Sequence, residues 1–567
     1  MKFFAIAVTV ACFITTGLAQ RPDFNRSRTY DVQHYVIRVS FDHKKRTVFG
    51  DTTVELKPLA DGFRTAELDA DGLKFETIKL EEIDKQLTYK TEKDRVIVTL
   101  DREYKAGELI KLRFKYSATP KKGVYFVDEE TGEGNRKRSA QIWTQGEPEE
   151  TRHWFPAFDF PSDKATAEQF ITAAKNMTII GNGELVNETE NTDGTKTAHY
   201  RMSTPFPTYL VSMVIGEYVK REETYNGIPL GIYMYPGTEF AIDKAYGRTK
   251  DMLRIHEALT GIKYPFNKYD QTIVANFQFG GMENITATTM ADTEIFAAQT
   301  PFLQGLVEDL VAHEIAHSWF GNNVTMKNWA ELWLNEGFAT FMEAAVREKL
   351  NGRRDYIRKI GINADEVMAD EAARRDPFGL FNQTAANTDK LFDRPAITYS
   401  KGGVVVHMLR EQVGNENFWK AINLYLTRHR FGNVETGDLQ KAMEDTSGRQ
   451  LGWFFDQWVY GTSYPKLTVK QRYDEAKKQL VLEIEQTQKG KLTPAAFRLP
   501  LEIALHTTAP IDSEAEASPD PLADAFMTTT IQIDKRKQTI TVPVAQKPAR
   551  VSFDPKAKLP LIAINVN

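Results

Sequence analysis

Cysteine is almost absent from this sequence of 567 residues, since the single one, Cys12, lies in the apolar N-terminal segment. A disulfide framework is therefore excluded, and so are thiolate ligands for a metal in the rest of the chain. Any transition metal must be held by histidine and carboxylate side chains. That donor set favours an open catalytic site over a closed structural one.

Long apolar runs are also lacking after residue 20. The first residues differ, because Lys2 precedes an apolar stretch that reaches Leu18 and small residues precede Gln20. This pattern predicts a signal peptide over residues 1–19, export to the periplasm or the extracellular space, and no permanent membrane span after cleavage. A retained membrane anchor is the alternative, and lipid attachment at Cys12 is left open.

Neither sign of charge dominates the sequence. Lys and Arg number 72 against 77 Asp and Glu, a net charge of -5, so no basic surface for nucleic acid is expected. Hydrophobic residues make up 41% and charged residues 26% of the chain, as in ordinary globular proteins. The length is too great for one core and indicates about three domains.

Apolar periodicity divides the chain into three regions after the signal peptide. Residues 20–222 alternate apolar and polar side chains, which predicts an antiparallel β-domain. Helical patterns dominate residues 223–463, with one strand expected at 271–276, and the alternation returns over residues 464–567. We therefore expect a multi-domain α+β protein, with a mixed α/β region between two β-domains.

A candidate metal-binding motif lies in the middle region, where His313, Glu314 and His317 form the pattern His-Glu-x-x-His. Residues four apart lie on one face of a helix, so both imidazoles can bind one ion. Glu314 lies about a quarter turn away, beside the open side of that ion, where it can act as general base. Two ordinary buried histidines on an amphipathic helix are the alternative.

Glu336 is the candidate third ligand. It lies on a second predicted helix that begins near Trp329, with Asn328 as its cap and Glu331 reaching back to complete a capping box. Its neighbours are apolar, which makes an ordinary surface glutamate the weaker alternative. A short loop lets the two helices pack together, and the resulting His-His-Glu set would hold one zinc ion per chain with a position open for water.

Three further features carry a resemblance to a known family. They are the 18-residue interval between His317 and Glu336, Gly-Gly-Met-Glu-Asn at 280–284, and Tyr-Ser-Lys-Gly at 399–402. Their order and spacing resemble the gluzincin zinc aminopeptidases of peptidase family M1, which include aminopeptidase N and the leukotriene-epoxide hydrolase. The resemblance implies a thermolysin-like catalytic domain, followed by a β-sandwich-like C-terminal domain. We expect the superhelical C-terminal domain of larger members to be absent.

The resemblance also implies the residues that bind substrate. Glu283 is expected to bind the free α-amine of a peptide, and Tyr399 to stabilise the oxyanion. Met282, Phe279 and Gln145 are expected at the pocket for the first side chain. The complete set of implied substrate contacts is Gln145, Glu147, Gly280, Gly281, Met282, Glu283 and Asn284.

These features together predict a zinc aminopeptidase that acts on peptides with a free N-terminus. A zinc endopeptidase is the second possibility, although Glu283 would then be a buried carboxylate in the path of the chain before the cleaved bond. A catalytically silent binding scaffold of the same fold is the third. The sequence leaves open the preferred first residue and the oligomeric state.

Overall fold

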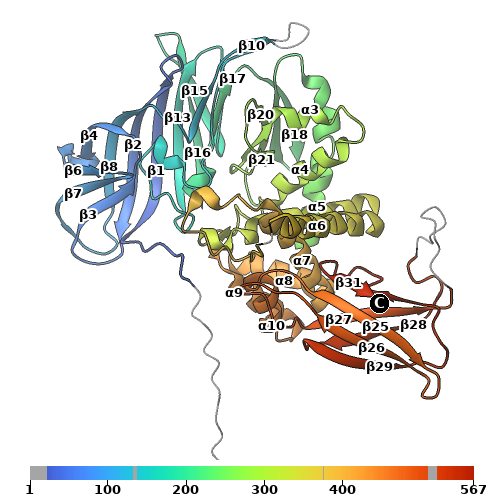
Figure 1. Cartoon of the computed structure of the whole chain (residues 1–567). Helices are drawn as coiled ribbons and strands as arrows, with labels where there is room; N and C mark the ends of the chain where they lie inside the picture. Colours follow the sequence, from blue (N-terminus) through green and yellow to red (C-terminus); the bar gives the residue numbers. More distant parts are fainter. Residues whose placement is uncertain (1–21, 132–136, 375, 509–519, 567) are drawn as a thin grey trace, which may run out of the picture.

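The computed structural model describes residues 22–131, 137–374, 376–508 and 520–566 (Figure 1). The predicted signal peptide, including Cys12, lies outside these residues. Among the described residues, no helix is both long and apolar enough to cross a membrane. The predicted α+β fold class is confirmed. A strand-rich N-terminal domain comes first, a region that combines a sheet with helices follows, and two further sheets end the described chain.

The largest sheet of the N-terminal domain has eight strands. Strand β8 (Ile110–Ala118) buries every second side chain and turns the others outward, as the alternating sequence predicts. One pairing departs from the antiparallel expectation, because β1 (Tyr30–Asp42) lies parallel to β13 (Ala165–Ala174), and the long connection between them permits this. Across the sheet the order is β15 (Glu184–Glu190), β16 (Thr195–Phe206), β13, β1, β2 (Thr47–Pro58), β8, β4 (Lys74–Leu80) and β5 (Lys85–Gln86).

Besides a two-stranded sheet of β10 (Glu130–Thr131) and β11 (Lys137–Arg138), two smaller sheets belong to the same domain, and one of them leads into the site. The first contains β3 (Phe63–Asp69), β7 (Arg95–Tyr104) and β6 (Thr88–Glu92); the second contains β14 (Thr178–Gly181), β17 (Met213–Gly216), β12 (Gln141–Thr144) and β9 (Val124–Val127). Strand β12 ends directly before Gln145. Its Trp143 donates a hydrogen bond from Nε1 to the carbonyl oxygen of Ala275 at 3.1 Å. This bond ties the start of the 145–152 loop to the catalytic domain.

A five-stranded sheet opens the middle region. Strand β18 (Val219–Tyr225) belongs to it, so the predicted boundary after residue 222 falls inside a strand. The strand expected at 271–276 corresponds to β20 (Tyr269–Val274). At the edge, β21 (Gly281–Met282) pairs antiparallel with β22 (Ala287–Ala291), while β20 lies parallel to β22 and to β19 (Ile228–Met234). The edge strand therefore carries two of the residues expected to contact substrate.

Helices pack against this sheet and against one another. Figure 1 shows α4 (Gln304–Ala316) between the sheet and α5 (Trp333–Asn351). Helix α5 also packs against α6 (Arg353–Arg374) and α7 (Gly402–Val413), so its first fourteen residues are buried on all sides. The remaining helices of the region are α1 (Ile242–Tyr246), α2 (Thr249–Thr260), α3 (Asp292–Ala297), α8 (Asn415–Arg428), α9 (Thr436–Ser447) and α10 (Gly452–Phe455).

The predicted capping box before α5 is wrong. The Asn328 side chain does accept a hydrogen bond from the backbone of Ala330, but it caps a short 3-10 turn at Trp329–Glu331. Glu331 does not reach back, because its carboxylate accepts a hydrogen bond from the Thr436 hydroxyl at 2.5 Å. The α-helix begins only at Trp333 and places Glu336 in its first turn. A tertiary partner thus displaces the local capping interaction.

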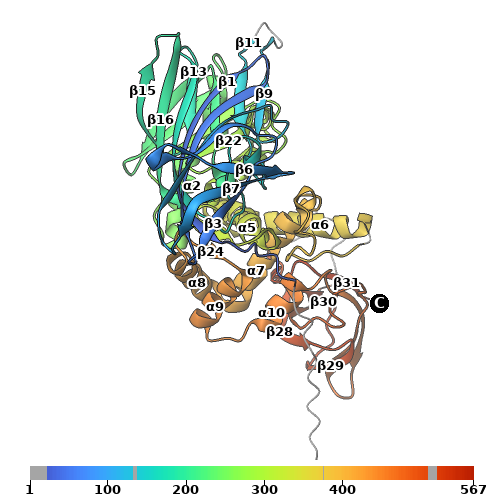
Figure 2. The same cartoon turned by 90° about the vertical axis from the view of Figure 1, so that its left-hand side faces the viewer.

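Two facing sheets form the C-terminal domain, which lies to the right of α7 and α10 in Figure 1 and again beside α10 in Figure 2. Each sheet contributes buried apolar side chains, among them Leu482 from one and Leu501 from the other, as expected for a sandwich. One sheet has the order β29 (Lys537–Pro543), β26 (Gln479–Gln486), β25 (Lys466–Asp474), β31 (Ala563–Val566), and the other β28 (Ala525–Ile533), β27 (Leu499–His506), β30 (Arg550–Phe553).

A pair of glycines fixes the distance between α5 and α7. A Cβ atom added at Gly402 would lie 2.6 Å from the Cα atom of Gly337, and one added at Gly337 would lie 2.8 Å from Gly402. Neither position can therefore carry a side chain without moving a helix. Gly337 directly follows Glu336, and Gly402 lies three residues after Tyr399, so this contact also sets the distance between those two side chains.

We expect Gly402→Ala to destabilise the protein by about 1–3 kcal/mol, because the new methyl group overpacks the crossing of the two helices. Thermal unfolding of wild type and variant at one scan rate measures the effect. Gly361→Ala in α6 is the matched control, since no atom lies within 4 Å of its added Cβ and helix propensity predicts a neutral or slightly stabilising change. Equal unfolding temperatures for both variants would refute the tight contact.

Candidate active site

The end of α4 presents three functional groups on one buried face. His313, Glu314 and His317 are all at least nine-tenths buried, and the two imidazole rings have their centroids 4.8 Å apart. The helix ends at Ala316, directly before His317, whose backbone N–H donates a hydrogen bond to the His313 carbonyl at 3.3 Å. The four-residue spacing therefore brings the imidazoles together as expected from helix geometry.

Glu336 meets both histidines from the first turn of α5. Its Oε2 atom lies 3.1 Å from Nε2 of His313 and 3.4 Å from Nε2 of His317. The three possible ligand atoms lie within 4.8 Å of one another, and all three residues are buried. The structure thus brings together the three ligands that the sequence nominates.

Each imidazole is oriented by its second nitrogen. Nδ1 of His313 lies 2.8 Å from Oε1 of Glu343, and Nδ1 of His317 lies 2.9 Å from the carbonyl oxygen of Phe320. When the ring is neutral, donation by Nδ1 to an oxygen leaves the lone pair of Nε2 available for a metal, the arrangement typical of histidines that bind one. The sequence prediction missed Glu343, although it lies seven residues, about two turns, after Glu336.

Opposite charges concentrate at this point. Burial disfavours a charged imidazole, but hydrogen bonds with Glu336 and Glu343 outweigh it and raise the pKa of His313 to about 9. Burial raises the pKa of Glu314 to about 8. Burial also opposes ionisation of Glu336, yet the two histidines lower its pKa. Two imidazole nitrogens and a carboxylate with an excess of buried acidic groups around them fit a divalent cation such as zinc.

A cavity of about 460 Å³ opens beside these groups. The edge strand β21 forms one wall, and a Cβ atom at Gly281 would lie only 2.2 Å from Oε1 of Glu314. Glycine at 281 is therefore required for the carboxylate of Glu314 to lie against this strand. The predicted site residues that line the cavity are Glu147, Gly280, Gly281, Met282, Glu283, His313, Glu314, His317, Glu336 and Tyr399.

Buried acceptors gather at one end of this cavity. Carboxylate oxygens of Glu147, Glu283 and Glu336 lie within 4.8 Å of one another. Oε1 of Glu147, Oε1 of Glu283 and Oε1 of Gln145 are buried and find no hydrogen-bond donor among the described residues. Burial, followed by repulsion from Glu283, raises the pKa of Glu147 well above its usual value. Such a cluster is suited to a cationic group that donates several hydrogen bonds.

Tyr399 lies on a short π-helix at Ala396–Lys401 that continues into α7. Its ring stacks on His313, with centroids 5.9 Å apart and an interplanar angle of 22°. Such π-helical turns are uncommon and often lie at functional sites. The sequence alone gives no signal for this turn, which adds one residue to the helical repeat and aims Tyr399 into the cavity.

The remaining predicted contacts lie at the margins of this cavity. Phe279 is 39% exposed and lines it, whereas Gln145 donates from Nε2 to the sulfur of Met282 at 3.2 Å. Asn284 is fully buried, and its amide donates to the Thr289 hydroxyl at 3.0 Å. Asn284 therefore stabilises the strand and is not among the residues that line the cavity.

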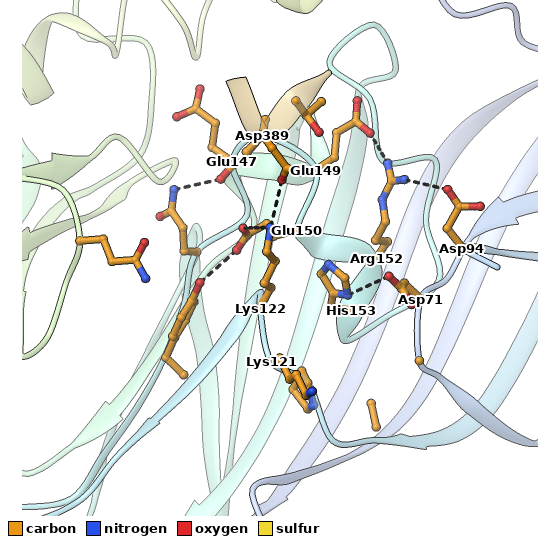
Figure 3. A pocket seen from close by; sticks show the side chains of 18 of the residues that line it. Asp71, Asp94, Lys121, Lys122, Glu147, Glu149, Glu150, Arg152, His153 and Asp389 are labelled. Carbon is orange, nitrogen blue, oxygen red and sulfur yellow. Dashed lines mark hydrogen bonds and ion pairs between the residues drawn. The ribbon is translucent and has the colours of Figure 1, made fainter. Parts of the chain in front are cut away.

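A second, larger cavity of about 830 Å³ adjoins the first between the N-terminal and catalytic domains (Figure 3). Glu147, Phe279 and Phe392 line both cavities. An ion pair between Lys122 and Asp389, at 3.3 Å, joins the two domains at its side. The end of the site that carries the buried acceptors is thus continuous with a larger cavity, and charged side chains are among the residues that line it.

Comparison with known proteins places these observations in a family. The Peptidase M1 N-terminal domain matches residues 31–210, and the Peptidase family M1 domain matches residues 244–458. Aminopeptidase 2 of Candida albicans is 29% identical over 68% of this chain and 42% of its own length. Aminopeptidase N of Streptomyces lividans is 32% identical over 58% of this chain and 40% of its own length.

A solved structure has the same fold over nearly the whole chain. The crystal structure of Legionella pneumophila aminopeptidase A in complex with aspartic acid superposes with a TM-score of 0.77 at 19% identity, over 96% of this chain and 60% of that one. The chain spans half or less of the length of the curated relatives that it matches. The two matched domains show that the chain belongs to peptidase family M1.

Proposed function

We propose that this protein is a zinc-dependent aminopeptidase that removes N-terminal residues from peptides. One observation carries the proposal: the carboxylates of Glu147 and Glu283 converge within 4.8 Å of Glu336, which also meets both histidines. A site for a cation and a cluster for an ammonium group are therefore direct neighbours. The names of the relatives, all aminopeptidases, support the same activity.

His313, His317 and Glu336 would hold one zinc ion per chain. When bound, zinc supplies Lewis acidity that activates water and a peptide carbonyl. Glu314 lies beside this set, and its Oε2 atom is buried without a donor among the described residues. We assign it the role of general base, which takes a proton from the attacking water and returns it to the leaving amine.

Tyr399 is assigned to the developing oxyanion. Its ring is held against His313 by the π-helical turn, and it lines the same cavity. A phenol that donates to an oxygen as that oxygen gains negative charge lowers the barrier by about 3–4 kcal/mol when it is held in place beforehand.

Glu283 is assigned to the substrate α-amine, with Glu147 and Gln145 as further acceptors. An ammonium bound by buried carboxylates a fixed distance from the reacting carbonyl measures off one residue, which gives an exopeptidase. An endopeptidase would have to place a neutral peptide group against these charges without satisfying them, and this is costly. A silent scaffold is disfavoured because ligands, base and oxyanion donor are all present in one cavity.

We also propose that the protein acts outside the cytoplasm. The composition of residues 1–19, with Lys2 before an apolar run and small residues before Gln20, supports export.

Glu314→Gln should lower kcat for an aminoacyl 4-nitroanilide by about 10²–10⁴-fold, the usual contribution of a general base. Bound zinc, measured by atomic absorption, should stay at one ion per chain. Glu308→Gln is the matched control, since this residue lies on the same helix but pairs with Arg248 at 3.4 Å. Substantial activity in the Glu314 variant would show that the base is misassigned.

Glu283→Ala should reduce kcat/KM for unblocked peptides by about 10²-fold, because it removes the buried carboxylate that would pair with the substrate α-ammonium. N-acetylated versions of the same peptides should be poor substrates for wild type and variant alike. If the variant still trims unblocked peptides with near wild-type efficiency, the amine binds elsewhere.

Glu343→Gln should weaken zinc binding by about 10–100-fold, since loss of the carboxylate that orients His313 lowers the basicity of that ligand. Competition with a chromogenic chelator measures the dissociation constant. Glu348→Gln, one to two turns further along α5 and paired with Arg410 at 2.8 Å, is the control. Equal zinc affinity in the two variants would mean that Glu343 does not tune the site.

A further inference from the structure

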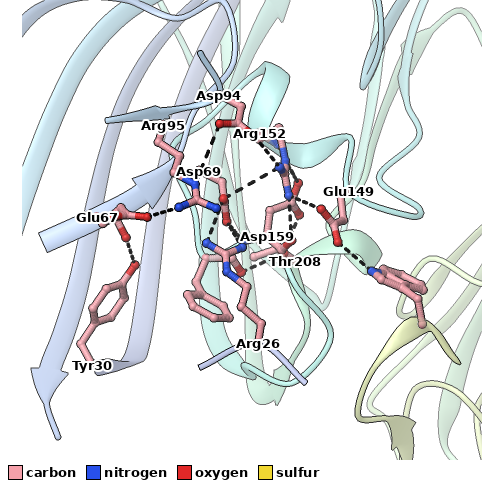
Figure 4. Close-up of polar contacts among 12 residues, drawn as sticks. Arg26, Tyr30, Glu67, Asp69, Asp94, Arg95, Glu149, Arg152, Asp159 and Thr208 are labelled. Atoms are coloured by element: carbon pink, nitrogen blue, oxygen red, sulfur yellow. Dashed lines mark hydrogen bonds and ion pairs between the residues drawn. The ribbon is translucent and has the colours of Figure 1, made fainter. Parts of the chain in front are cut away.

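Glu149 lies in the 145–152 loop, two residues after Glu147, and has no role in the site as described so far. Its carboxylate connects two domains: Oε1 accepts a hydrogen bond from Nε1 of Trp329 at 2.9 Å, and Oε2 accepts one from Arg152 at 2.5 Å (Figure 4). Trp329 belongs to the catalytic domain, whereas Arg152 belongs to the N-terminal domain. Glu149 is therefore bonded on both sides of the boundary between them.

On the catalytic side, Trp329 stands at the start of the element that carries Glu336. It opens the 3-10 turn that leads into α5. Its ring packs on Tyr209 of the N-terminal domain with centroids 5.5 Å apart, and the amide of Asn335, next to Glu336, donates to the Tyr209 hydroxyl at 3.3 Å. A displacement of Trp329 would therefore be transmitted to the first turn of α5.

On the N-terminal side, Arg152 is held by a buried ionic network (Figure 4). Its Nε atom lies 3.2 Å from Asp159, which is fully buried, and its guanidinium lies 3.9 Å from Asp69. Asp69 is also fully buried and pairs with Arg26 at 2.7 Å. A third carboxylate, that of Asp94, lies 3.8 Å from the same guanidinium. Arg152 is thus anchored by three carboxylates besides Glu149, and it offers Glu149 a fixed point.

We infer that Glu149 is a positioning residue, which fixes the amine-binding Glu147 relative to the ligand Glu336 by bridging Arg152 and Trp329. The inference rests on the proposed function. The loop and α5 belong to different domains, so their separation is set by contacts across the boundary and not by either fold alone. An error of about 1 Å in the placement of a substrate-binding group can cost about 10²-fold in efficiency.

Glu150 offers a matched control within the same loop. It is also a partly buried carboxylate, but it accepts hydrogen bonds from the backbone of Gly123 at 3.2 Å and from the Tyr125 hydroxyl at 3.1 Å (Figure 3). It also pairs with Lys122 at 3.7 Å, and all three partners lie in the N-terminal domain. Removal of Glu150 therefore tests the loss of a loop carboxylate without loss of the bond across the boundary.

The experiment compares Glu149→Ala, Glu149→Gln, Trp329→Phe and Glu150→Ala in the zinc-loaded full chain, with leucine 4-nitroanilide as substrate. We expect Glu149→Ala to raise KM about tenfold while kcat stays within about threefold and zinc content is unchanged. Glu149→Gln still accepts from Trp329 and should recover most of the loss. Trp329→Phe should also raise KM. The double variant Glu149→Ala/Trp329→Phe should have a KM no higher than that of Glu149→Ala, because both substitutions remove the same hydrogen bond.

Two results would overturn the positioning role: an unchanged KM in Glu149→Ala, or an equal rise in Glu150→Ala. Calorimetric titration with leucine amide repeats the comparison without turnover, and weaker binding to Glu149→Ala than to Glu150→Ala supports the role independently of catalysis. A wild-type protein that neither hydrolyses the anilide nor binds the amide would refute the proposed function itself. If the wild type hydrolyses the anilide normally and Glu149→Ala has the same KM as the wild type, only the inference about Glu149 is refuted.

Discussion

Glu336 touches both His313 and His317, and the geometry of the whole site depends on this meeting of two helices. The contact forces α4 and α5 to lie side by side with their functional ends aligned. It also explains why glycine occupies position 337, where α5 must approach α7 closely enough to bring Tyr399 over His313. The same helix contacts thus determine both the packing of the domain and the positions of its reactive groups.

The same contact concentrates acidic side chains where water is excluded. Glu147, Glu283, Glu314, Glu336 and Glu343 are all buried near two imidazoles, an arrangement that costs free energy unless cations balance it. Lys359 contributes one such charge, since its Nζ atom lies 2.6 Å from Glu343. A metal ion and a substrate ammonium would supply the others. The buried carboxylates would therefore favour binding of cationic ligands, at a cost to the stability of the fold without them.

Much of this arrangement could be predicted from the sequence because it depends on short-range periodicity. The spacing of His313 and His317 fixes one helix face, and alternating apolar residues fix the strands of both β-domains. The errors arise where distant partners decide. Thr436 draws Glu331 away from the predicted capping box, and a long connection allows the parallel pairing of β1 with β13. The π-helix at Tyr399 and the contacts of Glu149 leave no local pattern at all.

The cluster that would select an N-terminal residue has members from two separately built parts of the chain. Gln145 and Glu147 follow a strand of the N-terminal domain, while Glu283 and the histidines belong to the middle region. In the proposed function, recognition of the chain end would therefore draw on both folding units, whereas the ion would be held by the middle region alone. Substitutions at Gln145 or Glu147 would then change how the N-terminal residue is recognised while the ligands of the ion stay unchanged, so selectivity and reactivity could change at different rates.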